Sequence, residues 1–377
     1  MTYLSRLAGK LSPGARLAAR DRRGAAARHE MTQIDLARCI CIFMMIGVHV
    51  YPGVRETTLF YNGPLHGFWL VYMDFLGRAS VAVLSFFSGY ILYQQAARKS
   101  VWNIAEQRFR TVYMPMVTWS AVKILMVLVL VLVEGGSFAD WLEREGLNSL
   151  KGWANDLFAL TDQPANLPLG FLRDLFVSIV LVRLLVPALP WLWPVVLAVT
   201  LVLTLFRLTE PVVLRPSILL FVLAGACFAL SGRPLRALSR PKVAIPAAGL
   251  LLTVFLAATL MPPDTPILAE EIPNIAKRAT LVFAILLVTD QIVRRAKLPE
   301  LAPVRQLLFL IFLTHGLVSQ ALGELWERTG IANTSGYYAL FYVVSIAIFI
   351  CVGLILNRLV DYLPARLQVA IAGRARG

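Results

Sequence analysis

The sequence predicts an all-α, polytopic membrane protein with about ten transmembrane helices around a polar cavity and with both termini in the cytoplasm. Three observations carry this prediction. The 377 residues are 58% hydrophobic and only 15% charged, with a mean hydropathy of +0.70, which is too apolar for a soluble domain. The apolar residues form ten separate stretches near the length that a bilayer core requires. The charged residues alternate in sign between successive loops.

The ten expected spans are residues 34–53, 68–92, 112–133, 171–187, 190–206, 215–231, 243–261, 278–293, 306–323 and 337–357. Two of them, 171–187 and 278–293, are short, which fits helices that are tilted or partly buried among their neighbours. Residues 1–33 are basic and lack the apolar core of a signal peptide, so a cytoplasmic tail is expected there. One transmembrane domain over 34–358 and a cytoplasmic tail over 359–377 complete the expected organisation.

The loop charges set the expected orientation. Arg and Lys gather in the N-terminal segment and in every second loop, around residues 98–110, 233–242, 294–305 and 358–376. The positive-inside rule makes these segments cytoplasmic, so the net charge of +14 reflects membrane orientation and no nucleic-acid partner is expected. The outer turn RLTEPVVLRPS is an exception, because it carries Arg207 and Arg215. The long outer loop at about 134–170 is expected to lie on the membrane surface or to cover a cavity.

The first span, IDLARCICIFMMIGVHVYPG, carries Arg38 and His49 eleven residues apart. Eleven residues make about three helical turns, so both side chains fall on nearly one face, about 16 Å apart along the axis. A charge inside a span is costly and usually faces a protein-lined cavity. One helix is therefore expected to present a cation near the cytoplasmic side, for an anionic ligand, and an imidazole further out, for proton chemistry.

Five short motifs follow one another in a fixed order along the chain. They are Asp35, Arg38 and His49 in the first span; RASVAVLSFFSGY, which begins at Arg78; RFRTVYMP with Arg108 and Arg110; FLRDLF with Arg173 and Asp174; and FLIFLTHGLV with His315. In this order they resemble the acyltransferase-3 family of integral-membrane O-acyltransferases, which modify glycans and related acceptors. The resemblance covers about residues 35–320. Gln33 departs from it, because the family often has a basic residue there.

The resemblance implies transfer of an acyl group, most simply acetyl from cytoplasmic acetyl-CoA, to a hydroxyl of an exported or lipid-linked glycan at a bacterial inner membrane. The catalytic residues that it implies are His49, Arg38 and Asp35, with His49 as general base or as a transient acyl carrier. The donor-binding residues are Arg38, Arg78, Arg108 and Arg110. The acceptor-binding residues are Arg78, Tyr90, Arg173, Asp174 and His315. No metal is expected.

Structural roles remain open for several of these residues. Asp35 could orient Arg38 or be a first-turn residue favoured by the helix dipole. Arg78 could pair with Asp74, the Ser-Gly-Tyr motif could mark close helix packing, and His315 could be a hydrogen-bonded core residue. Arg173 and Asp174 could pair with neighbouring residues.

Two other functions remain open at this point. Succinyl transfer is one, and a glycan or amphiphile transporter is the other. In a transporter, intramembrane Arg and His would form a translocation path. Transporters often consist of two related halves, and the sequence shows no such repeat, which favours the enzyme.

Overall fold

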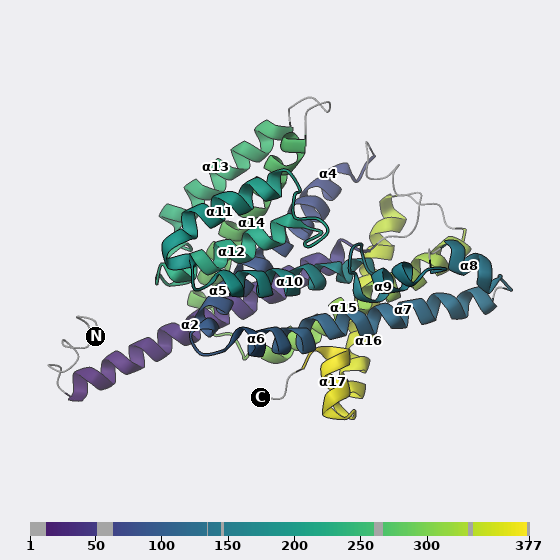
Figure 1. The fold of residues 1–377 in the computed structure, drawn as a ribbon, viewed down its shortest axis with the longest axis horizontal. Coiled ribbons are helices and arrows are strands. Elements are labelled where there is room, and N and C mark those ends of the chain that lie inside the picture. Colours follow the sequence, from purple (N-terminus) through teal and green to yellow (C-terminus); the bar gives the residue numbers. More distant parts are fainter. Residues whose placement is uncertain are drawn as a thin grey trace.

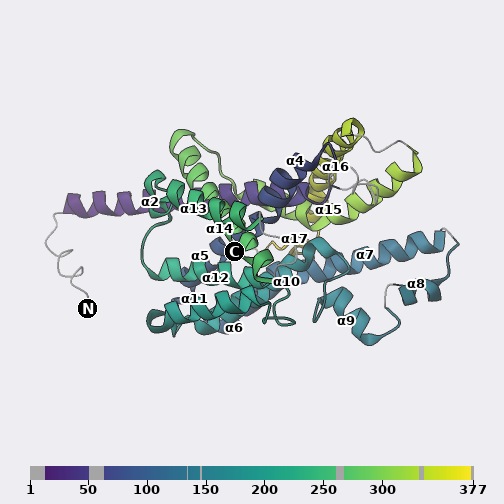
Figure 2. The same cartoon turned by 90° about the horizontal axis from the view of Figure 1, so that it is seen from above.

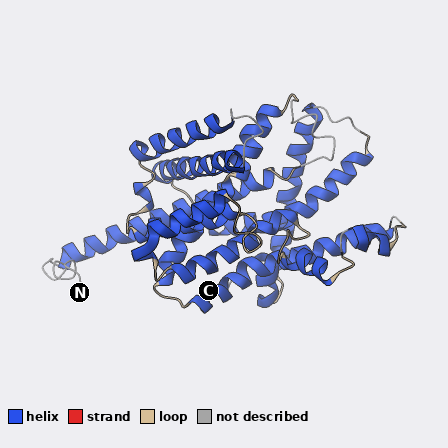
Figure 3. Cartoon of the chain, turned by 45° about the horizontal axis from the view of Figure 1, so that its top comes forward, coloured by secondary structure: helices blue, strands red, loops and turns tan. Residues whose placement is uncertain are grey.

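The computed structural model describes residues 13–50, 63–133, 135–144, 147–259, 267–330 and 335–374. Regular structure in these residues is helical throughout, and they contain no strand (Figure 3). The first helix, α2 (Pro13–Gly47), has 35 residues. Its N-terminal part projects from one side of the bundle, and α7 and α8 extend on the opposite side (Figures 1 and 2).

The other elements follow along the chain. They are α4 (His66–Phe68), the π-helix η2 (Trp69–Arg78), α5 (Ser80–Ala96), α6 (Val101–Arg108), the π-helix η3 (Phe109–Tyr113), α7 (Met114–Val133), α8 (Phe138–Arg144), α9 (Leu150–Phe158), η4 (Leu167–Leu169), α10 (Gly170–Leu185), α11 (Leu189–Leu205), α12 (Pro216–Leu230), η5 (Leu235–Ala237), α13 (Pro241–Thr259), α14 (Ile267–Arg295), α15 (Ala302–Arg328), α16 (Ser335–Asp361) and α17 (Ala365–Ala372).

Each of the ten expected spans falls mainly on helix where the structure describes it, but the first helix ends earlier than expected, at Gly47, and His49 lies in the turn that follows. Among the described residues, five helical segments are long and apolar enough to cross a membrane: His66–Ala96, Val101–Val133, Glu270–Arg295, Ala302–Arg328 and Gly336–Asp361. The helices α10, α11 and α12 have 16, 17 and 15 residues, and at 1.5 Å per residue these lengths fall short of a bilayer core of about 30 Å. The chain is thus an all-helical membrane-type protein, and the count of ten spans stays a prediction.

The centre of the bundle contains α2, which packs against α5, α14 and α15. Among the described elements, α5 and α12 pack together most extensively, and two glycines explain why. A Cβ on Gly89 would lie 1.8 Å from the Val222 carbonyl oxygen, and one on Gly225 would lie 1.9 Å from the Phe86 carbonyl oxygen. Gly89 of the Ser-Gly-Tyr motif therefore allows close helix packing, which was one of the two roles that the sequence left open for the motif.

Gly89→Ala is expected to destabilise the protein by about 1–3 kcal/mol, because the new methyl group forces two helix backbones apart. Gly249→Ala on α13 is the matched control, since a Cβ there meets no atom within 4 Å. It should leave stability unchanged or raise it by up to about 1 kcal/mol. The measurement is the thermal unfolding midpoint of each variant in detergent, and equal midpoints for the two variants would contradict the packing argument.

The middle of α2 packs onto the bundle. Tyr90 Oη donates a hydrogen bond to Glu30, and His29 Nε2 lies 2.9 Å from Asp290 Oδ1. Gln33 is fully buried and its amide donates to Ser239 Oγ and to the Leu286 carbonyl oxygen, both at 3.0 Å. The expected boundary at residue 33 thus lies inside α2, and the residues around it are part of the helical domain.

The C-terminal segment also folds onto the bundle. Trp119 Nε1 on α7 donates to the Ile371 carbonyl oxygen at 2.8 Å, and α17 packs against α7. The helix ends at Gly373, which has a φ of +65°, a conformation that glycine adopts without strain. Residues 359–374, which were expected to be a tail, therefore have ordered partners in the helical domain.

Candidate active site

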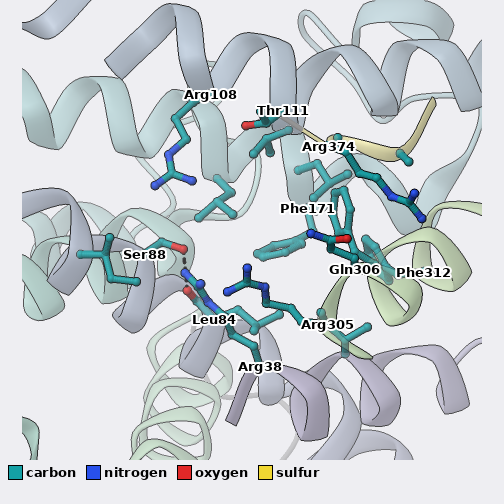
Figure 4. A pocket seen from close by; sticks show the side chains of 18 of the residues that line it. Arg38, Leu84, Ser88, Arg108, Thr111, Phe171, Arg305, Gln306, Phe312 and Arg374 are labelled. Carbon is teal, nitrogen blue, oxygen red and sulfur yellow. Dashed lines mark hydrogen bonds between the residues drawn. The ribbon is translucent and has the colours of Figure 1, made fainter. Parts of the chain in front are cut away.

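A cavity of about 420 Å³ opens between α2, α5, α6, α10, α15 and the C-terminal segment. Its cationic side chains are Arg38, Arg108, Arg305 and Arg374 (Figure 4). We call this space the arginine cavity. Ser88, Gln95, Gln107, Thr111 and Gln306 supply further polar groups, and Phe171, Phe309 and Phe312 supply aromatic surface. Four guanidinium groups around one cavity fit a ligand with several phosphate or carboxylate groups.

Two of these arginines are held by carboxylates. Arg305 donates to Asp35, and Arg374 donates to Asp361 and to Asn357. The Nε atoms of Arg108 and Arg374 have no hydrogen-bond partner among the described residues, and no carboxylate partner of Arg108 is described. The cavity therefore keeps an excess of positive charge, which is what an anionic ligand would neutralise.

His49 lines a second cavity, of about 360 Å³, which we call the histidine cavity. Its three cations are Arg78, Arg215 and Arg278. The structure thus separates the two polar residues of the first span, with Arg38 in one cavity and His49 in the other. Their spacing predicted a separation along one helix around a single polar cavity; in the structure Arg38 lies on α2, His49 lies in the turn after α2 ends at Gly47, and they line separate cavities.

Neutral groups hold two of the arginines in the histidine cavity. Arg215 donates to Gln163 Oε1 at 2.9 Å, and Arg278 donates to Ser217 Oγ. Asp74 lies 4.0 Å from Arg78 and accepts a shorter hydrogen bond, of 2.6 Å, from Lys277. The charge around His49 is therefore positive overall, and an anionic group would be attracted to it.

The backbone next to His49 is held on both sides. Ser319 Oγ on α15 donates to the His49 carbonyl oxygen at 2.5 Å, and the His49 N–H donates to the Ile46 carbonyl oxygen at 3.1 Å. A Cβ on Gly77 would lie 1.9 Å from Val48 Cγ2, so α2 and the π-helix η2 approach closely here. π-Helical turns are rare and often occur at functional sites, and η2 ends at Arg78.

His315 lies beside His49 but lines neither cavity. The two imidazole rings have centroids 5.2 Å apart. His315 Nδ1 lies 2.6 Å from the Phe312 carbonyl oxygen, and a carbonyl only accepts, so this nitrogen carries the hydrogen. Its Nε2 is then an acceptor, buried and without a partner among the described residues. His315 therefore packs against His49, and its contacts fit the hydrogen-bonded core residue that the sequence left open.

Asp35 has a different partner from the one expected. It lies in the interior of α2, more than twenty residues from the start at Pro13, so the first-turn interpretation is wrong. Its ion pair is with Arg305 on α15. The Asp35 carboxylate therefore joins α2 to α15 at the edge of the arginine cavity and holds Arg305 in position there.

Four other candidates lie outside both cavities. Arg110 is 66% exposed and pairs with Glu106 at 2.6 Å. Tyr90 bonds to Glu30. Arg173 donates to Asp174 and to the carbonyl oxygens of Ala159, Leu160, Pro211 and Val212. These contacts are with neighbouring residues, and ligand binding by the four stays a prediction.

Sequence reasoning missed four arginines that line the cavities: Arg215, Arg278, Arg305 and Arg374. A signal existed for Arg215, since it belongs to the outer turn that breaks the positive-inside pattern. Arg305 and Arg374 looked like ordinary cytoplasmic charges, and only the fold brings them beside Arg38. No group of three or more His, Cys, Asp and Glu side chains is placed to hold a metal ion in the part of the chain that is described.

Apolar helices around two cation-lined cavities define a multi-pass membrane protein whose cavities suit anionic ligands. The acyltransferase-3 family model, described as an acyltransferase domain, matches residues 31–357. The chain therefore belongs to the acyltransferase-3 family and is an O-acyltransferase. A succinoglycan biosynthesis protein, ExoH of Rhizobium meliloti, is 28% identical over 352 residues, which is 92% of each chain. No solved structure shows significant similarity to the chain.

Proposed function

We propose that the protein moves an acyl group from cytoplasmic acyl-CoA to a hydroxyl of an exported or lipid-linked glycan at a bacterial inner membrane. The observation that carries this proposal is the pair of cavities along α2 and the turn that follows it, with Arg38 in the first and His49 in the second. Similarity to a succinoglycan biosynthesis protein supports a polysaccharide as acceptor. The basic loops next to the arginine cavity support entry of the donor from the cytoplasm.

The arginine cavity is the proposed donor site. Coenzyme A carries phosphates and amides, and guanidinium groups bind phosphate in a bidentate manner. Among the described residues, no carboxylate binds Arg38 or Arg108, so both can bind an anion. Arg305 and Arg374 are held in place by carboxylates. The pantetheine arm then points the thioester along α2 toward His49.

His49 is the proposed general base. Neutral imidazole accepts the proton of the glycan hydroxyl while the oxygen attacks the thioester carbonyl carbon. The new C–O ester bond forms as the C–S bond breaks, and the coenzyme A thiolate leaves and takes up a proton. An acyl group carried briefly on His49 would give the same products, and both routes remain within the proposal. His315 orients the base.

Arg78, Arg215 and Arg278 supply positive charge where the carbonyl oxygen becomes negative, which lowers the barrier to attack. One stabilising group would serve an acetyl donor, but three guanidinium groups line this cavity. The excess favours a second candidate, transfer of a succinyl group, because its terminal carboxylate would pair with an arginine. Acetyl transfer, which the sequence resemblance favours, needs no such partner.

Arg278→Gln should lower the ratio of succinyl to acetyl transfer about tenfold or more, since a charged hydrogen bond contributes about 1.5–3 kcal/mol. The assay uses inverted membrane vesicles of the cell that makes the protein, with its own copy deleted, and labelled acetyl-CoA or succinyl-CoA. Arg108→Gln in the arginine cavity is the control, because it should weaken both donors equally. A wild type that prefers acetyl-CoA, with a ratio unaffected by Arg278→Gln, would exclude the succinyl candidate.

The outer loop is the proposed acceptor path. A third cavity, of about 360 Å³, lies under α8 and α9 and includes Lys123, Trp141, Asp156, Asp162 and Gln163. It shares Leu167 with the histidine cavity. Carboxylate, amide and ammonium groups of this kind suit sugar hydroxyls, so this loop is expected to contribute to acceptor choice.

The same vesicles test the proposed function itself. Labelled acyl-CoA should transfer its acyl group to a glycan fraction only when the protein is present, and an alkali treatment that cleaves esters should release the label. Vesicles that hold the folded protein and native acceptor but show no transfer above the deleted strain would contradict it.

A further inference from the structure

Two side chains separate the arginine cavity from the histidine cavity. Met45 and Phe171 are the residues that line both spaces. Met45 lies on α2 between Arg38 and His49, and Phe171 lies in the first turn of α10. Each is only 5% exposed. The wall between the two cavities is therefore apolar and is contributed by two helices.

The wall is supported from behind by aromatic rings. Phe171 and Phe312 meet edge to face with centroids 6.5 Å apart, and Phe312 stacks on His315 at 5.3 Å. His315 in turn lies beside His49. The phenyl ring of Phe171 thus has little freedom to withdraw toward Phe312, while Met45 is flexible and can yield.

We propose that Met45 and Phe171 form an acyl aperture that sets the length of the acyl chain the enzyme accepts. The inference rests on the proposed function, since a thioester bound beside Arg38 brings its carbonyl to His49 only across this wall. A short acyl group fits past the phenyl ring, and a longer one meets it. Phe171→Ala removes the six ring carbons and opens the passage, and Met45→Ala removes the thioether.

The test measures acyl-chain preference within each variant. Vesicles carrying the full-length protein receive acetyl-, butyryl- or hexanoyl-CoA, and the released coenzyme A thiol is followed after subtraction of the deleted strain. Phe171→Ala and Met45→Ala should each raise the ratio of hexanoyl to acetyl turnover about tenfold or more, since one methylene in an apolar pocket already changes selectivity by about tenfold or more. A ratio taken within one variant does not depend on how much protein folds.

Two buried residues that line neither cavity serve as controls. Ile46→Ala is next to Met45 on α2, and Ile179→Ala lies about two turns after Phe171 on α10. Both should keep the wild-type ratio. Phe171→Leu is the milder variant if Phe171→Ala does not fold, and it should shift the ratio in the same direction.

The outcomes separate the inference from the function on which it rests. Wild-type turnover with an unchanged ratio in all aperture variants would overturn the aperture alone. Folded wild type that turns over none of these three donors and no succinyl-CoA in the presence of its native acceptor would overturn the proposed function, and the aperture with it. Equal shifts in the aperture and control variants would also overturn the aperture, because the effect would then be general loosening of the core.

Discussion

His49→Ala is expected to lower acyl transfer by about 10²–10⁴-fold, which is the usual contribution of a general base. Acyl-CoA binding should survive, because the donor cavity lies along α2 at Arg38 and does not include His49. The measurement is labelled acyl transfer to glycan in vesicles, normalised to the amount of folded protein. Loss of turnover with retained donor binding is the result that assigns proton chemistry to this imidazole.

His29→Ala, on α2, is the matched control. His29 contacts Asp290 and lines neither cavity, and Asp290 keeps a second partner in Arg294 at 2.5 Å. Transfer by this variant should stay close to the wild-type rate. Near-normal transfer by folded His49→Ala would remove His49 from the chemistry and leave the arginine-rich cavities as binding sites only.

Arg173→Ala is expected to destabilise the fold by about 3–5 kcal/mol. The Arg173 side chain is only 6% exposed and binds Asp174 and backbone carbonyls from two loops. Its removal leaves the Asp174 carboxylate with one described donor, the Leu214 N–H at 3.0 Å. The thermal unfolding midpoint of purified protein in detergent measures the effect.

The comparison with Arg110→Ala sharpens this prediction. Arg110 was also expected to bind a ligand, but it is exposed and pairs only with Glu106 among the contacts described. Exposed ion pairs contribute about 0–1 kcal/mol, so its unfolding midpoint should hardly move. An Arg173→Ala protein that is as stable as wild type but fails to bind acceptor would instead support the ligand-binding role.

The sequence predicted the site best where residues close in the chain carry it. Arg38 lies on α2 and His49 lies in the turn just after α2 ends at Gly47, so helical geometry accounts for most of their separation, although one polar cavity was expected and the two residues line separate cavities. Asp35 shows the limit of this reasoning. Its spacing suggested Arg38 as a partner, but Arg305 approaches from α15, 270 residues further along the chain.

The number of transmembrane helices was harder to predict from the sequence, because an apolar helix can be buried inside the protein instead of facing lipid. Leu219, Phe221 and Val222 on α12 are buried inside the bundle, so this helix of 15 residues reads as strongly apolar without the length to span a bilayer. The α2 helix shows the converse, since charged residues precede its apolar half. Hydropathy records apolar character, and it does not distinguish a lipid-facing helix from a buried one.

Acyl-CoA binding and turnover by detergent-purified protein, wild type beside Arg38→Ala and His49→Ala, test the central claim most directly. The claim is that donor binding at Arg38, on α2, and proton transfer at His49, in the turn after α2, occur in two separate cavities. It predicts that Arg38→Ala loses donor binding, and that His49→Ala binds the donor but does not turn it over. Folded wild-type protein that shows no interaction with any acyl-CoA would contradict it.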